Sequence, residues 1–383
     1  MPVAVDDFSV LRVSPFTEAL TKFEELTTQS RRAFLIGAGA SKCAGLPLMD
    51  ELTRLAWSSS KLSTTARTIL TGLQAAFSGA TNANIEDFLS ELIDLLAIAE
   101  RRKVRNATSQ TVQIGGVDYT EKDLSDAAEN IKQAIAEALD SNPTADVHRA
   151  FVRAVHKTLR PGKWASDQSV DYLVLNYDTL LEEALALEKM PFSDGLDGGA
   201  TGWWDPTTFD RPDLVARVLK LHGSINWCEF SGETLPRRIG NKFGSNPAGT
   251  ERVLIWPAST KYRETQKDPY AQLADRARQV LKPPVSKDLV LIICGYSFGD
   301  THINSEIDRA LRESEGQLAV IVFTYDTVPT GLLKAWNEDP FIKDQVLIYA
   351  RGGFFHGSNH APATVDLPWW KFENVTRLLG GDR

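Results

Sequence analysis

Three short groups of polar residues follow apolar, β-branched runs in this chain, and their side chains are of kinds that bind and catalyse. They are Asn176-Tyr-Asp178, His222-Gly-Ser-Ile-Asn226 and Gly295-Tyr-Ser-Phe-Gly-Asp300. Because the carboxyl ends of parallel strands meet at one edge of an open sheet, the three groups are expected to share one site. Its amide and imidazole suit proton transfer on a hydroxyl or a water. Each group alone is equally typical of a turn or a helix cap, so the prediction depends on their occurring together.

A glycine turn precedes these groups in the sequence. Ala33–Ile36 is predicted to be a short buried strand, and Gly37-Ala-Gly-Ala-Ser41 follows it. Gly37 and Gly39 lack the side chains that would keep an anion from the backbone, and a helix from about 47 to 57 would offer its amino end. The third glycine of the common dinucleotide fingerprint is absent, so a tight strand-to-helix turn explains the pattern almost as well.

The elements that must position these groups form an alternating pattern. Strands of a buried parallel sheet are predicted at Ala33–Ile36, Tyr172–Leu175, Val218–Leu221, Leu289–Cys294, Leu318–Thr324 and Val346–Ala350. Helices are predicted after several of them, at Thr179–Leu187, Thr301–Arg312 and Pro329–Asn337. The alternation predicts an α/β fold with a Rossmann-like, doubly wound parallel sheet.

A helical subdomain is expected to be inserted into this sheet domain. Asn84 is a plausible N-cap for a helix that begins at Ile85, and a second apolar stripe runs from Leu124 to Leu139. We therefore predict three parts: a Rossmann-like domain (1–59 and 161–360), the helical subdomain (60–160) and a C-terminal tail (361–383). A segment at 228–267, rich in Gly, Pro and charge, is expected to form a loop or hairpins near the site. The apolar faces of the subdomain predict a homo-oligomer through Leu89, Leu92, Leu96, Ile131 and Ile135.

Composition excludes several classes of function. The net charge of −8 argues against nucleic acid as the main ligand, and the basic run Arg101–Arg105 is expected to be a solvated helix end. No apolar run is long enough to cross a membrane and no signal peptide is visible, so a cytoplasmic location is expected. Cys43, Cys228 and Cys294 are far apart and show no zinc-ligand spacing, which predicts a site without metal.

Taken together, these residues resemble the Sir2 (sirtuin-like) family over most of residues 30–330. The motifs that carry the resemblance are Gly37-Ala-Gly-Ala-Ser41, Gly45-Leu-Pro47, Asn176-x-Asp178, His222-Gly-Ser224 and Gly295-x-Ser297. Three segments have sequences closer to bacterial Sir2-like NADases of antiphage defence than to protein deacetylases. They are Lys220–Trp227, Gly295–Asp300 and Ile85–Ser90. The four-cysteine zinc module of the deacetylases is missing, and Leu48 follows Gly-x-Pro where they carry Asp.

The resemblance implies that NAD is the substrate and that the site divides into catalytic and binding residues. Asn176 would hold a ribose hydroxyl or a water, and His222 would act as the general base. Asp178 would orient the nicotinamide amide or only cap its helix. Ser41 and the glycine-turn amides would face the diphosphate, and Ser297 and Asp300 would lie near the adenosine half. The implied binding residues are Gly37, Ala38, Gly39, Ser41, Gly45, Pro47, Gly295, Ser297 and Asp300.

The implied activity is an NAD⁺ glycohydrolase that depletes NAD during phage infection, in some relatives together with a HerA-type ATPase encoded alongside. Two alternatives stay open. A protein deacylase would release nicotinamide only with an acylated peptide, and a non-catalytic sensor subunit would bind NAD or ADP-ribose without turnover.

Overall fold

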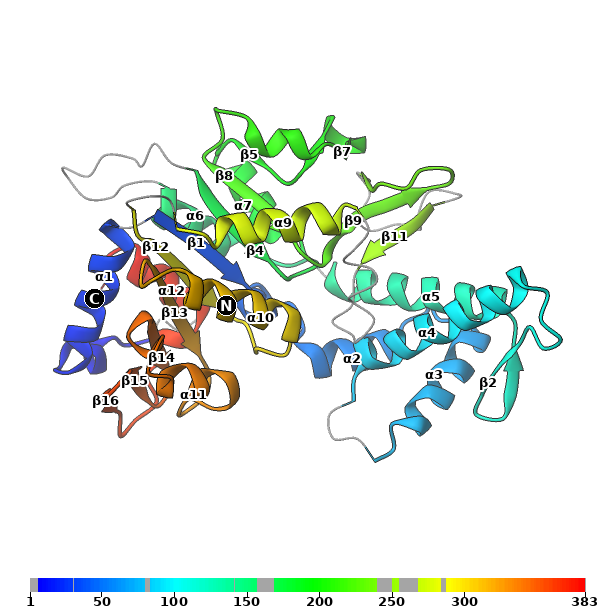
Figure 1. Ribbon diagram of the computed structural model, residues 1–383, viewed down its shortest axis with the longest axis horizontal. Helices are drawn as coiled ribbons and strands as arrows, with labels where there is room; N and C mark the ends of the chain where they lie inside the picture. Colours follow the sequence, from blue (N-terminus) through cyan, green and yellow to red (C-terminus); the bar gives the residue numbers. More distant parts are fainter. Residues whose placement is uncertain are drawn as a thin grey trace.

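The computed structural model describes residues 6–29, 31–79, 83–140, 142–156, 169–239, 250–254, 268–283 and 287–382. Its centre is a nine-stranded sheet in the order β16-β15-β14-β13-β12-β1-β4-β8-β5 (Figure 1). The strands are β1 (Arg31–Ile36), β4 (Val170–Val174), β5 (Phe192–Ser193), β8 (Ala216–Lys220), β12 (Leu289–Cys294), β13 (Leu318–Thr324), β14 (Val346–Ala350), β15 (Gly353–His356) and β16 (Asn359–Pro362). Every pair from β5 to β14 is parallel, and β15 and β16 are antiparallel. The six strands expected from the sequence are confirmed, as is the fold class.

The order of the strands reverses beside β1. The chain leaves β1 for β4 on one side and later returns to β12 on the other side, so β1 and β12 are neighbours although they are far apart in sequence. In open α/β sheets a crevice for ligands forms outside the carboxyl ends of the strands at such a reversal. The register pairs Ile36 with Cys294, so the glycine turn and the Gly295 turn leave the sheet side by side.

Helices cover both faces of the sheet because successive strand residues point to opposite sides. Phe34 and Ile36 face one core with α1 (Phe16–Gln29), α6 (Asp146–His156), α7 (Leu180–Leu187) and α12 (Phe372–Leu379). Ala33 and Leu35 face the other core with α9 (Tyr270–Val280), α10 (Thr301–Glu313) and α11 (Gly331–Glu338). The helix after the glycine turn is preceded by a 3-10 helix, η2 (Ala38–Ala44).

The helical subdomain has a core of its own and lies at one end of the molecule (Figure 1). It contains α2 (Met49–Ser58), α3 (Thr64–Ala76), α4 (Ile85–Val104), the hairpin β2 (Val112–Ile114) and β3 (Val117–Tyr119), and α5 (Glu121–Leu139). Asn84 caps α4 in a capping box with Asp87, as its position predicts. The basic run at the end of α4 is largely exposed, and Lys103 pairs with Glu121 at 2.6 Å.

The packing of the helices bears on the expected domain boundaries. Helix α2 packs on α5 in the subdomain core, whereas α6 packs on α7 and α12 against the sheet. The C-terminal segment is also part of the sheet domain, since Trp369 and Val375 are fully buried in that core. This packing favours a subdomain of about 49–140, and the division of the chain into domains stays a prediction.

The apolar faces of the subdomain give no argument for an oligomer. Leu89, Leu92, Ile131 and Ile135 are 0% exposed within a single chain, where they pack on one another. The homo-oligomer therefore stays a prediction without this support.

Smaller elements complete the fold near the site. A second sheet, in the order β11-β9-β10-β7-β6, is formed by β6 (Leu196–Asp197), β7 (Trp203–Trp204), β9 (Gly223–Phe230), β10 (Arg237–Arg238) and β11 (Thr250–Leu254). It includes part of the segment 228–267, of which 240–249 and 255–267 lie outside the described residues. The remaining 3-10 helices are η1 (Ser9–Arg12), η3 (Gly199–Thr201), η4 (Pro206–Asp210), η5 (Lys343–Gln345) and η6 (Pro368–Trp370). Within the described part of the chain, no helix has the length and apolarity to span a membrane.

One buried histidine makes the stability of the sheet domain depend on pH. His156 lies 2.7 Å from the Tyr172 hydroxyl, and burial, with nearby Arg32, lowers the pKa of its imidazole from 6.5 to about 4. As the pH falls below 6.5, this histidine binds a proton in the unfolded chain. In the folded chain it stays neutral until about pH 4. We expect this group to cost about 3 kcal/mol of unfolding free energy across that interval. Denaturant titrations of wild type and His156→Gln at pH 7.5 and 4.5 measure it, and an equal pH dependence in both would contradict the assignment.

Candidate active site

The glycine turn after β1 packs directly on the turn after β12. The Gly37 amide donates to the Cys294 carbonyl at 2.9 Å and the Gly39 amide donates to the Gly295 carbonyl at 2.8 Å. A Cβ atom on Gly37 would lie 2.5 Å from the Gly295 oxygen, and one on Gly39 would lie 2.8 Å from the Gly295 Cα. These two glycines thus allow two backbones to touch, and their amides donate to the neighbouring turn, while their role at a diphosphate stays a prediction.

Two separate features of the structure require glycine at position 295. Its φ of +65° lies in the left-handed region, and a Cβ there would be 2.1 Å from the Ala40 nitrogen. The turn can therefore be made only by glycine.

Ser41 joins the glycine turn to the polar group Asn176–Asp178. Its side chain is buried in η2, where Oγ accepts from Asn176 Nδ2 at 2.7 Å and donates to Asp178 Oδ2 at 2.7 Å. The sequence implied that this hydroxyl faces a diphosphate. In the structure it links the turn after β1 to the turn after β4, and its role toward a diphosphate stays a prediction.

Asn176 carries an unpaired polar atom in the site, and Asn226 carries another. The Asn176 side chain is 6% exposed, and its amide nitrogen is held by Ser41. Its Oδ1 is buried and has no hydrogen-bond partner among the described residues. An unpaired buried carbonyl oxygen is costly, and such atoms occur where a ligand or a water supplies the donor.

Asp178 has both carboxylate oxygens engaged. Oδ2 accepts from Ser41, and Oδ1 accepts from the Leu180 amide at 3.1 Å, in the first turn of α7. Asp178 stands one residue before Thr179, the N-cap of α7, and its Oδ1 holds the first amide of that helix. A role toward a nicotinamide amide stays a prediction.

His222 and Asp300 form a pair that local sequence reasoning missed. His222 Nε2 lies 3.0 Å from Asp300 Oδ2, and both side chains are buried. The other oxygen of Asp300 caps α10 through the His302 and Ile303 amides. A carboxylate accepts only, so Nε2 carries the ring proton and Nδ1 is left as the basic nitrogen. The available signal was that both residues follow strands of the same sheet edge.

Tyr177 connects the helical subdomain to this pair, and no local pattern indicated it. Its hydroxyl donates to Glu86 Oε1 of α4 at 3.2 Å, and its ring centroid is 6.4 Å from that of His222. Its carbonyl accepts from the Ile225 amide at 2.9 Å. The turn after β4 is therefore fixed against both the subdomain and the turn after β8.

For the other expected binding residues, the structure does not decide a role in binding. Ala38, Gly45 and Ser297 are exposed, whereas Pro47 is buried. Their contacts to a dinucleotide stay predictions.

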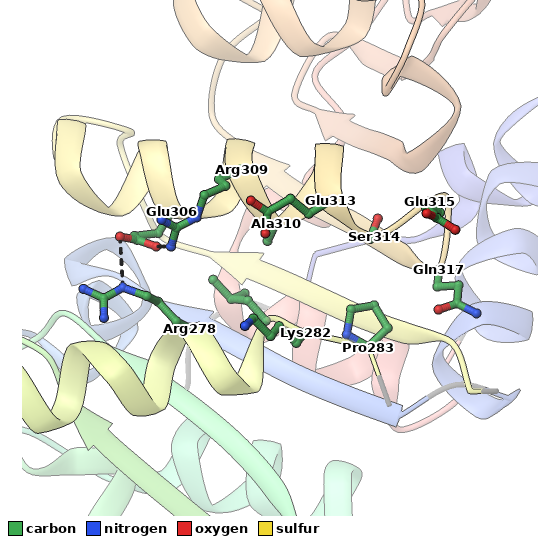
Figure 2. A pocket seen from close by; sticks show the side chains of 11 residues that line it. Arg278, Lys282, Pro283, Glu306, Arg309, Ala310, Glu313, Ser314, Glu315 and Gln317 are labelled. Carbon is green, nitrogen blue, oxygen red and sulfur yellow. Dashed lines mark hydrogen bonds and ion pairs between the residues drawn. The ribbon is translucent and has the colours of Figure 1, made fainter. Parts of the chain in front are cut away.

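Two cavities lie between α9 and α10, and they differ in their relation to the site. The one beside His222 and Asp300 is also lined by Tyr270 and has a volume of about 30 Å³. The larger, about 240 Å³, is lined by charged residues such as Arg278 and Glu306, which pair at 3.2 Å (Figure 2). Its lining reaches the residues that precede β13, so it faces the amino ends of the strands and is separate from the polar groups.

The prediction of a site without metal can be tested by experiment. Among the residues that the structure describes, no three His, Cys, Asp or Glu side chains are placed to hold a metal ion. We expect EDTA to leave the melting temperature and any NAD cleavage unchanged. Stoichiometric zinc in elemental analysis of the purified protein would contradict the prediction.

Comparison with known protein families gives a match over part of the chain. Residues 170–342 match the SIR2-like domain family. Curated proteins give no match. A solved Sir2 homologue in complex with NAD is similar at 14% identity over 95% of this chain and 93% of that chain, with a TM-score of 0.44. A Sir2 homologue with three substitutions, in complex with 2′-O-acetyl ADP ribose, gives 14% identity over 94% and 96%, with a TM-score of 0.39. Residues 170–342, which carry Asn176, His222 and Asp300, are therefore similar to a SIR2-like domain.

Proposed function

We propose that this protein is an NAD⁺ glycohydrolase that converts NAD⁺ and water to nicotinamide, ADP-ribose and a proton. The observation that carries the proposal is the buried, unpaired Oδ1 of Asn176 at the edge of the sheet that also holds the His222–Asp300 pair. A ribose hydroxyl or a water is the kind of donor that this oxygen lacks. The match of residues 170–342 to a SIR2-like domain supports NAD as the substrate.

Breaking the bond to nicotinamide requires little general-acid catalysis. The bond between the ribose anomeric carbon and the nicotinamide nitrogen breaks, and its electron pair leaves with a ring that was already cationic. Water forms the new bond to that carbon, and its proton passes to Nδ1 of His222 and then to solvent. Asp300 holds the imidazole in the tautomer that accepts this proton and stabilises the imidazolium that forms. Asn176 positions the attacked ribose or the water.

The deciding experiment measures nicotinamide release from NAD by the purified chain, with and without an acylated lysine peptide. Release from NAD alone supports the hydrolase. Release only with the peptide would establish the deacylase instead, and binding of NAD with no release under either condition would establish a sensor.

The proposal includes a role in antiviral defence. By its resemblance to bacterial Sir2-like NADases, the protein would stay silent until infection and then deplete NAD, alone as a homo-oligomer or with a HerA-type ATPase encoded beside it. Expression of the chain with its neighbouring gene in phage-infected cells, with cellular NAD as the readout, tests this role. An unchanged NAD level after infection would contradict it.

A further inference from the structure

A buried lysine lies between the two polar groups that the proposed chemistry uses. Lys220 is the last residue of β8, two positions before His222, and its side chain is 0% exposed. Its Nζ donates to the main-chain carbonyl of Asp178, across the parallel pair β4–β8, whose register places Val174 beside Lys220. The lysine therefore reaches from the strand that carries the base to the turn that carries Asn176.

The partner of this lysine is itself buried. Glu182, in the first turn of α7, has its Oε1 3.3 Å from Lys220 Nζ, and its side chain is 12% exposed. Burial raises the pKa of the Glu182 carboxyl, while Lys220 opposes that rise. Oε2 has no hydrogen-bond partner among the described residues. Removing a lysine and a carboxylate from water is costly, and well-packed apolar residues often replace such pairs without loss of stability.

The contact between Lys220 and the Asp178 carbonyl indicates a function for this costly buried pair. The turn from Asn176 to Asp178 has no regular backbone pairing along its length, so it must be held from outside. The Asn176 side chain is held by Ser41, the Tyr177 carbonyl accepts from Ile225, and the Asp178 carbonyl accepts from Lys220. The lysine supplies one of the contacts from the chain around His222, beside the Ile225 amide and the Ser224 hydroxyl, which both donate to the Tyr177 carbonyl.

We infer that Lys220 is a positioning residue that fixes the turn 176–178 relative to His222, with Glu182 as its buried ion-pair partner. The inference rests on the proposed function for its effect on catalysis. Its effect on the turn itself is independent of any activity.

The test replaces the pair as a unit, because Lys220→Met alone would leave Glu182 buried and unpaired and the variant could fail to fold. Lys220→Met/Glu182→Leu removes both charges and keeps apolar volume. We expect amide hydrogen exchange in 176–180 to become at least about tenfold faster, because an opening that the lysine opposes becomes easier. We also expect kcat for nicotinamide release to fall about 10²-fold while the KM for NAD stays within about twofold, because the reacting groups lose alignment and not contact with the ligand.

A matched variant separates positioning from the loss of any ion pair. Lys371→Met/Asp6→Leu removes a pair of 2.9 Å in another part of the fold and should leave both readings unchanged. Unchanged exchange in 176–180 in the folded Lys220→Met/Glu182→Leu protein would overturn the inference, as would unchanged kcat in an active enzyme. If wild type releases no nicotinamide under any condition, the proposed function fails, and the exchange measurement still decides the role of Lys220.

Discussion

His222→Ala and Asn176→Ala should each lower NAD cleavage by about 10²–10⁴-fold while leaving a folded protein that binds NAD. Removing His222 removes the base, and removing Asn176 removes the group that positions the ribose or the water. Both residues stand at strand ends, where truncation deletes a polar group and little of the core. The measurements are nicotinamide release and NAD binding by calorimetry.

Combinations and a control sharpen this test. If the two residues serve one step, the double variant should be little worse than either single variant. Asp300→Asn should also slow cleavage, because an amide in that place can donate to Nε2 and favour the wrong tautomer. His360→Ala, an exposed histidine in β16, should behave as wild type. Near wild-type turnover in folded His222→Ala would refute the mechanism.

Gly295→Ala should destabilise the protein by more than about 4 kcal/mol, because it combines a left-handed backbone with a steric clash. The added Cβ would meet the Ala40 nitrogen at 2.1 Å, where no flexible side chain can yield. Gly45→Ala is the matched control, since Gly45 has a φ of +90° and nothing within 4 Å of the added atom. That variant should lose only about 1–2 kcal/mol, the cost of left-handed backbone alone. Denaturant unfolding of both variants measures the difference.

Gly39→Val would act through the same contact between the two turns. A side chain there would meet the Gly295 backbone before it met a ligand, so lost NAD binding would report a displaced turn. Circular dichroism and unfolding must accompany the binding assay. Equal stability of Gly295→Ala and Gly45→Ala would show that the two turns are not packed as described.

The strands of the sheet could be predicted from the sequence because their pattern depends on local burial. A parallel strand covered on both faces, such as Leu289–Cys294, reads as an unbroken apolar run wherever it lies in the sheet. The cap at Asn84 was likewise visible, since its partner Asp87 is three residues away. That the polar groups follow strands of one edge was also predictable, because all parallel strands end at the same side.

Contacts between distant segments could not be read locally. The His222–Asp300 pair spans 78 residues and exists because the chain returns to place β12 beside β1. Strand order also decides that Gly37 and Gly39 face another backbone. A glycine pattern records only that a side chain is excluded, whether by a phosphate or by a neighbouring turn. The helical period of α6 shows that one face of the helix is buried. The cores of the sheet domain and of the subdomain are all apolar, so only the tertiary structure decided which core that face covers.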